Sequence, residues 1–462
     1  MQKNKKIGVW GFGVVGKSVL RYLLTIKGVA PWSFLVTDGK QLSLPDQDYL
    51  EENAVCFLPL EQFLQECDYI IPSPGIDLRN YVHYQYKFVA ELDLFVRACS
   101  EASSTPQLIG ITGTLGKTTI THCITELLKK SDRRACAAGN IGDALLDVVT
   151  HLSALDVIVL ELSSFQLERS ILFAPDLAIL TNLYPKHLDR HDTLEQYFAA
   201  KYNLFAHQKS HQHALLPAEY APQVYAKNPV QKLSFFSEAE LAAQDVRPED
   251  TLYFFDESGS IMRRVHNTYS IVLSAAQVPT TSYRINWLIM AAALDVLGYK
   301  LDAILSHAQA IALPSHRLEY VAQSCDITFY NDSKSTMMVA TQAAVAKLKQ
   351  LEPAVPILLI LGGVSEGLDR RVFMSWFAPH VTEIICYGGE ADILYAAAQA
   401  AHIRARSFST LESVFDYIRS CKQQRVNVLF SPGGASFDLY KNYVERGNAF
   451  KRLVNSFDMS NH

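Results

Sequence analysis

A segment with two glycines, a lysine and a threonine carries the clearest chemical signal in the sequence. Residues 108–119 read LIGITGTLGKTT, an apolar run that leads through a glycine-containing turn into a predicted helix. Gly113 and Gly116 let backbone N–H groups approach an anion, and the helix directs the positive end of its dipole at the same place. Lys117 can then reach terminal phosphates, and the Thr118 hydroxyl can bind Mg²⁺. The pattern predicts a nucleoside-triphosphate site, with a tight strand-to-helix turn that binds nothing as the alternative.

Three polar side chains follow this loop in the chain. Glu161 comes at the end of the buried run 156–160, where a carboxylate can complete a nucleotide–Mg²⁺ site, although a satisfied core acid is the plainer alternative. His187 lies beyond the end of the next predicted strand. Lys201 falls among apolar neighbours in a predicted helix, where a surface lysine with a buried stem is the alternative.

The N-terminal part carries a second nucleotide-type turn. An apolar strand over 6–10 is followed by G-x-G-x-x-G at 11–16, and the next predicted strand ends in Asp38. This is the form of a dinucleotide fingerprint. The motif alone does not distinguish a nicotinamide dinucleotide from another nucleotide such as a UDP-sugar, and the second is favoured here.

Strands and helices alternate along the whole chain, which predicts an α/β fold with mostly parallel sheets. Several strands end in polar or glycine-rich clusters, among them 331–336 and 431–438. Ligands of such folds bind at the carboxyl ends of the strands.

Composition limits the alternatives further. A chain of 462 residues suggests about three domains, and a net charge of −5 without a long basic tract argues against nucleic acid as a partner. The eight cysteines contain no C-x-x-C pair, which fits reduced thiols in the cytoplasm. No run of about 18 apolar residues is present, so no membrane insertion is expected.

Eight motifs in order resemble the Mur ligases across essentially the whole length: TGTLGKTT, GNIG, LELSSFQLE, TNLYPKHLDRH, AAK, PSHRLE, NDSKST and LFSPGGASFD. The resemblance implies three domains. These are a UDP-sugar-binding Rossmann-like domain over 1–104, a central P-loop ATPase domain over 105–298, and a C-terminal Rossmann-like domain over 299–462 that binds the amino acid and ATP.

Within the family the sequence is most similar to the branch that joins D-glutamate to UDP-N-acetylmuramoyl-L-alanine. The resemblance implies a cytoplasmic, monomeric enzyme of peptidoglycan-precursor synthesis that uses ATP and two Mg²⁺ ions. ATP would phosphorylate the alanyl carboxylate, and the amine of D-glutamate would then displace phosphate.

The resemblance also implies roles for individual residues. Lys117, His187 and Lys201 match catalytic positions, and Thr118, Glu161, His187 and Lys201 match the metal-binding positions. In the family the lysine at the position of Lys201 is carbamylated, which makes it an oxygen ligand suited to Mg²⁺. The remaining matches are: for ATP, Gly113, Thr114, Gly116, Lys117, Thr118, Thr119, Asn286 and Arg317; for the UDP-sugar, Val14, Val15, Asp38, Gly75 and Asn140; and for D-glutamate, Lys334, Ser436 and Tyr443.

The sequence departs from the family pattern at several positions. Leu115 replaces an asparagine of the phosphate loop, Ser282-Tyr283 stands where His-Asn is frequent, Gly39-Lys40 differs from Thr-Arg, and Tyr443 stands where phenylalanine is expected. Three rival interpretations stay open: a sister ligase for another amino acid or for a folate, an NAD(P)-dependent oxidoreductase, and a non-catalytic nucleotide-binding homologue. The oxidoreductase interpretation leaves the GKTT loop unexplained.

Overall fold

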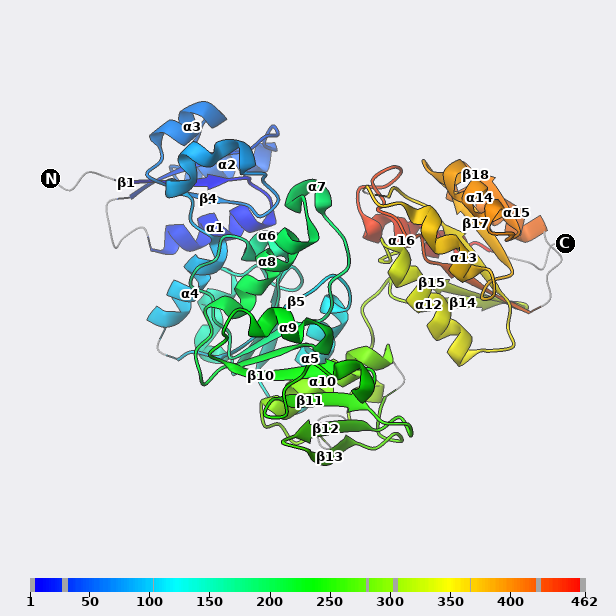
Figure 1. Cartoon of the computed structure of the whole chain (residues 1–462). Helices are drawn as coiled ribbons and strands as arrows, with labels where there is room; N and C mark the ends of the chain where they lie inside the picture. The colour runs from blue at the N-terminus through cyan, green and yellow to red at the C-terminus, as the bar shows by residue number, and fades with distance from the viewer. Residues whose placement is uncertain are drawn as a thin grey trace. The chain divides into compact units, whose positions relative to one another are not determined.

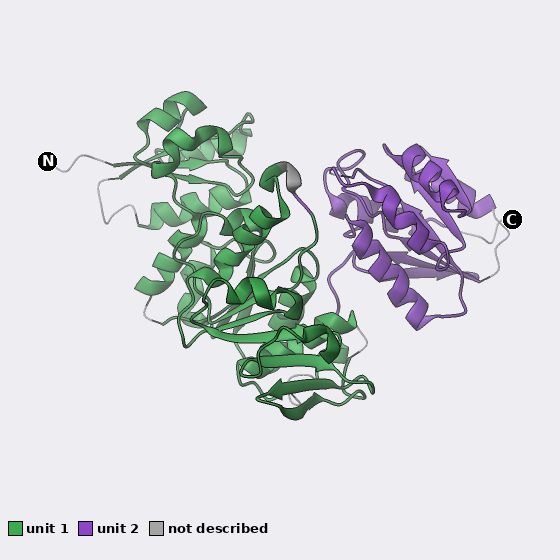
Figure 2. Cartoon of the chain, in the orientation of Figure 1, with its two compact units in different colours: residues 1–185, 190–311 green, residues 186–189, 312–462 purple. Residues whose placement is uncertain are grey.

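The computed structural model describes residues 5–26, 32–102, 104–279, 282–301, 306–365, 367–420 and 425–457. It contains three β-sheets that follow one another along the chain, each packed with helices (Figure 1). The predicted α/β class with mostly parallel sheets is confirmed. The chain divides into two compact units, residues 1–185 with 190–311 and residues 186–189 with 312–462 (Figure 2).

The first sheet has four parallel strands in the order β3-β2-β1-β4. Alternate residues of β1 enter opposite cores, because Val9 packs with one cluster and Trp10 with the other. The elements of this region are β1 (Lys5–Trp10), α1 (Val14–Thr25), β2 (Trp32–Thr37), α2 (Leu44–Glu52), β3 (Cys56–Phe57), α3 (Leu60–Glu66), β4 (Tyr69–Pro72), η2 (Arg79–Lys87) and α4 (Glu91–Glu101).

The second sheet has nine strands in the order β13-β12-β11-β10-β9-β8-β5-β7-β6, and only β12 and β13 run antiparallel to their neighbours. The phosphate-loop strand β5 lies between β8 and β7, so the loop that follows it is flanked on both sides. The elements are β5 (Gln107–Thr112), α5 (Lys117–Lys130), β6 (Ala135–Gly139), η3 (Val148–Ala154), β7 (Val157–Glu161), α6 (Ser164–Leu167), β8 (Leu177–Leu180), α7 (Leu188–His191), α8 (Leu194–Ala206), β9 (His213–Pro217), η4 (Ala218–Tyr220), α9 (Ala221–Tyr225), β10 (Lys232–Ser237), η5 (Glu240–Ala243), β11 (Thr251–Phe255), β12 (Ile261–Val265), β13 (Thr268–Leu273) and α10 (Arg284–Val296).

The third sheet has six strands in the order β14-β15-β19-β16-β17-β18, parallel except for β14. Its central strands are apolar on both faces because helices cover both, as in the fully buried ILLIL of β16. The elements are η6 (Ala308–Ala310), β14 (Glu319–Ser324), β15 (Ile327–Asn331), α12 (Met338–Leu351), β16 (Ile357–Leu361), η7 (Arg370–Phe373), α13 (Met374–Phe377), β17 (Glu383–Tyr387), α14 (Ala391–Ala400), β18 (Ala405–Phe408), α15 (Leu411–Ser420), β19 (Val426–Phe430) and α16 (Tyr443–Asn455).

Direct polar contacts join the first sheet region to the second. The Asp93 carboxylate on α4 is buried and accepts hydrogen bonds from the Ser170 hydroxyl at 2.6 Å and from the backbone N–H groups of Ile171 and Leu172. Arg21 on α1 pairs with Asp147 at 2.6 Å. A carboxylate that is removed from water and saturated with donors in this way fixes the approach of α4 to the loop after α6.

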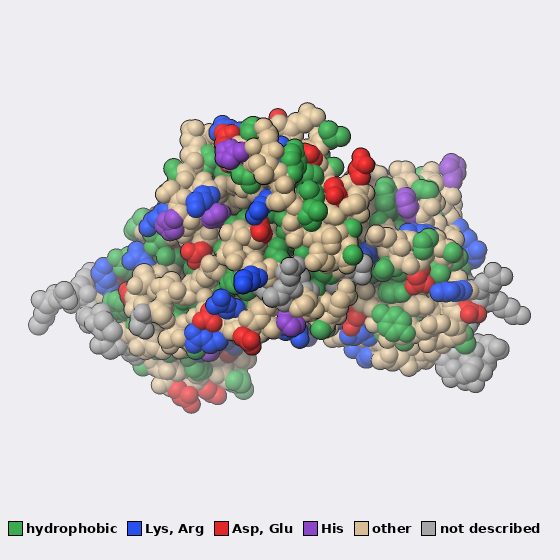
Figure 3. Space-filling view, turned by 90° about the horizontal axis from the view of Figure 1, so that it is seen from below, with side chains coloured by type: hydrophobic (Ala, Val, Ile, Leu, Met, Phe, Trp, Pro, Cys, Tyr) green, Lys and Arg blue, Asp and Glu red, His purple; other side chains and the backbone are tan. Residues whose placement is uncertain are grey.

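The surface is mixed in charge. On the face drawn in Figure 3, the described Lys and Arg side chains are interspersed with Asp and Glu rather than gathered in one patch. Among the described helices, none combines the length and apolar character needed to cross a membrane.

One buried side chain of the third sheet has polar atoms without hydrogen-bond partners, which should lower the stability of the fold. Asn427 on β19 is 1% exposed, and neither its Oδ1 nor its Nδ2 has a hydrogen-bond partner. Leucine has the same branching without the polar atoms, so we expect Asn427→Leu to raise the free energy of unfolding by about 1 kcal/mol. Urea unfolding of the two proteins measures this. Asn427→Asp is the control and should destabilise, because it buries a charge at the same place. A loss of stability in the leucine variant would contradict the assignment of an unpaired amide.

Candidate functional site

The phosphate loop between β5 and α5 depends on two glycines. Gly113 has φ +140° and Gly116 φ +85°, both in the region that disfavours a side chain. A Cβ on Gly113 would also collide with the Thr181 side chain. Gly116 is the N-cap of α5, a helix of 14 residues, so the N-terminus of a long helix faces the loop. Thr118 and Thr119 in its first turn are buried. The loop has the geometry of an anion site at a helix N-terminus.

Asn182, two residues beyond the end of β8, braces this loop. Its Oδ1 accepts from the Leu115 N–H at 2.8 Å, and its Nδ2 donates to the Leu115 carbonyl at 3.1 Å. The Thr181 hydroxyl donates to the same carbonyl at 2.6 Å. In the sequence Asn182 stands out only as part of TNLYPKHLDRH, so its bracing role is a finding of the structure. An asparagine directly after a buried strand was the available signal.

Thr114 anchors the loop on its other side. Its Oγ1 accepts from the Tyr184 N–H at 3.0 Å and lies 3.3 Å from the Tyr197 hydroxyl. Burial raises the pKa of Tyr197 to about 12, so its phenol stays neutral. Thr114 is therefore held between two elements that follow it in the chain, the loop after β8 and helix α8.

Two lysines converge on one carbonyl of the loop. Lys117 donates to the Gly113 oxygen at 2.8 Å and to the Thr114 oxygen at 3.1 Å. Lys201 on α8 donates to the same Gly113 oxygen at 2.9 Å, and its ammonium lies 4.6 Å from the centroid of the Tyr197 ring. Lys201 is 2% exposed, so the alternative of a surface lysine is wrong. Two cations this close to one oxygen favour an anion between them.

Glu161 ends β7 beside the GNIG segment. It is 2% exposed; its Oε1 accepts from the Asn140 Nδ2 at 3.1 Å, whereas its Oε2 has no hydrogen-bond partner. The Asn140 N–H also donates to the Glu161 carbonyl at 2.9 Å. A residue matched to the UDP-sugar and one matched to a metal therefore lie side by side. The alternative of a fully satisfied core acid does not describe this carboxylate.

Asn286 reaches the phosphate loop from a different part of the chain. It is buried on α10, and its Oδ1 lies 3.1 Å from where a Cβ on Gly116 would be. Its Nδ2 donates to the Ser282 hydroxyl at 3.1 Å. Serine thus provides an acceptor for the amide at a place where the sequence departs from the family pattern.

The residues matched to the UDP-sugar in the first sheet lie at the carboxyl ends of its strands. Val14 begins α1 and is 76% exposed, and Val15 follows it. The Asp38 carboxylate accepts from the N–H groups of Phe12, at 2.6 Å, and Lys40, at 2.8 Å. A Cβ built on Gly75 would meet nothing within 4 Å, so this turn is open. Asp38 therefore fixes the glycine-rich turn through its backbone.

The second unit contains the residues matched to D-glutamate, together with Arg317 and the segment of His187. Lys334 lies 5.0 Å from the centroid of the Tyr443 ring, and Ser436 is buried in the loop after β19. Nearby Asp332 is fully buried, which raises the pKa of its carboxyl to about 6. Arg317 precedes β14 and is half-buried. His187 has φ +56° and belongs to the segment 186–189 of the second unit, whereas Glu161 belongs to the first unit.

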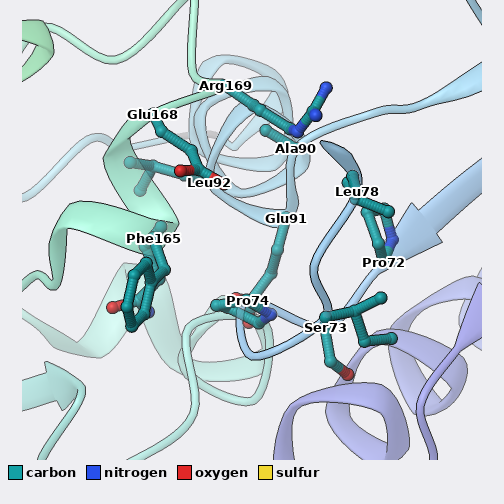
Figure 4. A pocket seen from close by; sticks show the side chains of 12 residues that line it. Pro72, Ser73, Pro74, Leu78, Ala90, Glu91, Leu92, Phe165, Glu168 and Arg169 are labelled. Atoms are coloured by element: carbon teal, nitrogen blue, oxygen red, sulfur yellow. The ribbon is translucent and has the colours of Figure 1, made fainter. Parts of the chain in front are cut away.

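A small cavity of about 20 Å³ lies beside the turn that carries Gly75, lined by Pro72, Ser73, Pro74, Ile76, Leu78, Ala90, Glu91, Leu92, Phe165, Gln166, Glu168 and Arg169 (Figure 4). Glu91 extends toward Pro74 in this view. It is 4% exposed and neither carboxyl oxygen has a hydrogen-bond partner. Burial, followed by the nearby charge of Asp147, raises the pKa of Glu91 to about 8. No motif or spacing in the sequence marks this residue.

Solved structures share this architecture. UDP-N-acetylmuramate–alanine ligase MurC from Thermotoga maritima is similar over 98% of this chain and 99% of its own, with a TM-score of 0.57 and 16% identity. MurF from Acinetobacter baumannii is similar over 87% and 88%, with a TM-score of 0.59 and 16% identity. At such identities the likeness concerns the fold. The shared fold is the series of three α/β sheets described above.

Sequence comparisons identify the family. Family models match residues 6–82 (MurD N-terminal domain), 111–293 (Mur ligase middle domain) and 316–434 (Mur ligase, glutamate ligase domain). A UDP-N-acetylmuramoylalanine–D-glutamate ligase of Desulfotalea psychrophila is 33% identical over 96% of this chain and 94% of its own. One of Bacillus cytotoxicus is 31% identical over 98% of both. The chain belongs to the Mur ligase family, and it is an amide ligase of peptidoglycan-precursor synthesis.

The raised pKa of Glu91 predicts a pH dependence of stability. Between its unfolded value of about 4.5 and its folded value of about 8, the folded chain binds more protons than the unfolded chain. The Glu91 contribution to stability is therefore present below pH 4.5 and is lost as the pH rises toward 8, by an amount on the order of a few kcal/mol. Glu91→Gln stays neutral, so it should remove this slope and be more stable than wild type above pH 8.

Thermal unfolding from pH 5 to pH 9 measures this difference. Glu101→Gln, at the exposed end of the same helix, is the matched control and should follow wild type. Asp147, Glu168 and Arg169 face or line the same region and are unchanged in both variants. Parallel curves for wild type and Glu91→Gln would contradict a protonated Glu91.

Proposed function

We propose that this chain joins D-glutamate to the alanyl carboxylate of UDP-N-acetylmuramoyl-L-alanine and consumes ATP through an acyl-phosphate intermediate. The observation that carries the proposal is the convergence of Lys117 and Lys201 on the Gly113 carbonyl of the phosphate loop, with Glu161 at the end of the adjoining strand. Full-length relatives with that printed name support the choice of substrates. A solved MurF ligase of Thermotoga maritima, with a TM-score of 0.56, holds ADP.

The residues of the loop suit phosphoryl transfer. Backbone N–H groups at the start of α5 would hold the phosphates, and Lys117 would neutralise charge that develops on the transferred phosphoryl group. The substrate carboxylate takes up that group as ADP leaves. The amine of D-glutamate then attacks the acyl carbon, loses a proton, and the tetrahedral intermediate expels phosphate. The protein's part is to hold two anions together, which requires fixed cations.

The donor set also fits Mg²⁺. Glu161 Oε2 is a buried carboxylate oxygen without a partner, and a hard cation prefers such an oxygen. Within the described ranges, no three His, Cys, Asp or Glu side chains form a metal cluster. Mg²⁺ is commonly bound by one or two carboxylates together with phosphate oxygens and water, so Glu161 and Thr118 would hold it jointly with the nucleotide. When bound, it would supply positive charge to the phosphates. His187 and Lys201 would hold a second ion; for this the Lys201 amine would first react with CO₂ to form a carbamate, which replaces the ammonium that the unmodified chain directs at the Gly113 oxygen.

The three regions would divide the substrates among them. The first domain, 1–104, would bind the UDP-sugar through Val14, Val15, Asp38 and Gly75, with Asn140 contributing from the central domain, 105–298. Asn286 in the central domain and Arg317 in the C-terminal domain, 299–462, would contact ATP. Lys334, Ser436 and Tyr443 in the C-terminal domain would receive the carboxylates of D-glutamate, for which a lysine and two hydroxyls are suitable partners.

Phosphate release tests the proposal. The purified chain is incubated with ATP, Mg²⁺ and UDP-N-acetylmuramoyl-L-alanine, together with D-glutamate, L-glutamate, L-alanine, L-lysine or meso-diaminopimelate. We expect release with D-glutamate only, and a product heavier than the UDP-sugar by one glutamyl residue in mass spectrometry. Release with a different amino acid only would make the chain a sister ligase, and no release with any of them would contradict the proposal.

A loss of Mg²⁺ affinity is expected for Glu161→Gln. The amide keeps the shape of the side chain but lacks the charge that attracts the ion, so kcat should fall by roughly 10²–10³-fold at standard Mg²⁺ and recover in part as Mg²⁺ is raised. Initial rates over a Mg²⁺ titration measure this. Glu126→Gln on the surface of α5 is the control. Unchanged Mg²⁺ dependence in the Glu161 variant would exclude Glu161 as a ligand.

For Lys201, arginine distinguishes a carbamate from a simple cation. A carbamate supplies an oxygen ligand, whereas a guanidinium keeps its positive charge and offers none. Lys201→Ala and Lys201→Arg should therefore both lose roughly 10³-fold in kcat. Short carboxylic acids should restore part of the activity of the alanine variant only.

The control for this pair is Lys209→Arg, an exposed lysine that follows the same helix. Mass spectrometry under conditions that retain CO₂ gives a second measurement, an added 44 Da on wild type that is absent from the Lys201 variants. An Arg variant as active as wild type would show that Lys201 acts only as a cation.

A further inference from the structure

Two fully enclosed guanidinium groups lie under the loops at the carboxyl ends of the third sheet. Arg446 is 0% exposed and Arg370 is 5% exposed. Arg370 donates to the carbonyls of Gly362 at 2.8 Å and Gly363 at 2.7 Å and pairs with Glu390 at 2.6 Å. Within the part of the chain that the structure describes, Arg446 has no carboxylate partner at this distance, and its acceptors are backbone carbonyls and one hydroxyl.

Arg446 links two loops that are distant in sequence. Its Nη2 donates to the Ser333 carbonyl at 2.7 Å, its Nε to the Ser333 hydroxyl at 3.1 Å, and its Nη1 to the Gly434 carbonyl at 2.9 Å. Ser333 follows β15 and Gly434 follows β19, which are neighbouring parallel strands. The planar guanidinium, with donors in a fixed fork, sets the separation of these two loops.

The same loops carry the three residues matched to D-glutamate. Lys334 is the direct neighbour of Ser333, and Ser436 lies two residues beyond Gly434. The third, Tyr443, begins α16, the helix that carries Arg446 in its first turn. The Ser333 hydroxyl, which accepts from Arg446, donates to the Tyr443 carbonyl at 2.8 Å. Each of the three therefore lies at most two residues along the chain, or one further hydrogen bond, from a group that Arg446 holds.

The Arg446 guanidinium packs closely against the backbone of Gly363, with no space for a side chain between them. A Cβ on Gly363 would come within 2.8 Å of the Arg446 Nη1. Removing a charge from water is costly, and the cost is offset only where the donors are satisfied by good acceptors. An apolar side chain in place of Arg446 would leave the Ser333 and Gly434 carbonyls without their donor. A core residue that served packing alone would not need this polar arrangement.

We propose that Arg446 is a positioning residue of the amino-acid site: it sets the distance between the loop of Lys334 and the loop of Ser436, and thereby the spacing of the groups that receive the two carboxylates of the amino acid. The proposal rests on the function proposed above and concerns the same site. Arg446 itself would not touch the substrate.

Arg446→Lys tests the proposal, because lysine keeps the charge but cannot donate in parallel to both loops. We expect KM for D-glutamate to rise about tenfold or more, while KM for ATP and for UDP-N-acetylmuramoyl-L-alanine stays within about twofold of wild type. Hydrogen exchange at residues 333–336 and 433–436 should become faster. Arg452→Lys, exposed on the same helix, is the matched control and should change neither quantity.

Ser333→Ala removes only the hydroxyl between Arg446 and Tyr443 and serves as a second, milder variant. It should raise KM for D-glutamate by a few fold. In the double variant it should add little to the effect of Arg446→Lys, since both substitutions disrupt the same hydrogen-bonded connection between Arg446, Ser333 and Tyr443. If Arg446→Lys does not fold, the Ser333→Ala result decides the proposal. A fall in kcat or in the active fraction, with KM for D-glutamate unchanged, would mean a purely structural role and would overturn it.

The wild-type measurement separates this inference from the proposed function. If wild type uses a different amino acid, the proposed function fails, and the same KM comparison is made with the amino acid that it does use. The hydrogen-exchange comparison needs no substrate. Unchanged exchange in both loops of the folded Arg446→Lys variant would overturn the positioning role even if the ligase assignment holds.

Discussion

The carbonyl oxygen of Gly113 is the acceptor on which the arrangement of the central site depends. It receives the ammonium groups of Lys117, from the helix after the loop, and Lys201, from a helix more than eighty residues further along. This carbonyl can accept both because Gly113 adopts a φ of +140°, which a residue with a side chain disfavours. The conformation of one glycine thus brings two ammonium groups together in the unmodified chain, and either anionic phosphates or carbamylation of Lys201 would relieve the repulsion between them.

Ordinary pattern reasoning predicts much of this arrangement. The run 357–361 is apolar throughout and coincides with β16, as expected for a parallel strand that is buried on both faces, and the run 383–387, which is apolar except for Glu383, coincides with β17. The apolar run after Asn286 indicates a helix, and α10 begins two residues earlier, at Arg284, because Arg284 and Asn286 interrupt the apolar run at its start. The phosphate loop and Glu161 follow from their positions after apolar runs. The placement of Lys201 came from the resemblance alone, because its helix does not reveal which loop it faces.

The side chains that sequence could not predict share a physical property: they act on backbone groups far away in the chain. Asn182 forms hydrogen bonds with the backbone of Leu115, 67 residues away in sequence, and Arg446 does so with the backbone of Ser333, 113 residues away. Every residue has a backbone carbonyl, so the sequence does not show which carbonyl accepts a hydrogen bond, and neither pairing produces a motif. Glu91 could not be predicted for a different reason: an acid in the first turn of a helix normally indicates an exposed, dipole-stabilised carboxylate. Only the packing of Pro74 and its neighbours around it shows that this one is enclosed.

The same property explains why the departures from the family pattern are compatible with an intact site. At Leu115 the contacts run through the backbone, whose N–H and carbonyl are both held by Asn182, so the loop is braced without a polar side chain at that position. Lys40 contributes its N–H to Asp38 in the same way. Tyr443 contributes its carbonyl to Ser333. These loops are held through their backbone N–H and carbonyl groups, which form hydrogen bonds with side chains of other residues. A loop residue's own side chain can therefore vary without loss of these bonds. The constraint falls instead on the residues that do the holding, whose removal would leave buried carbonyls and N–H groups unpaired.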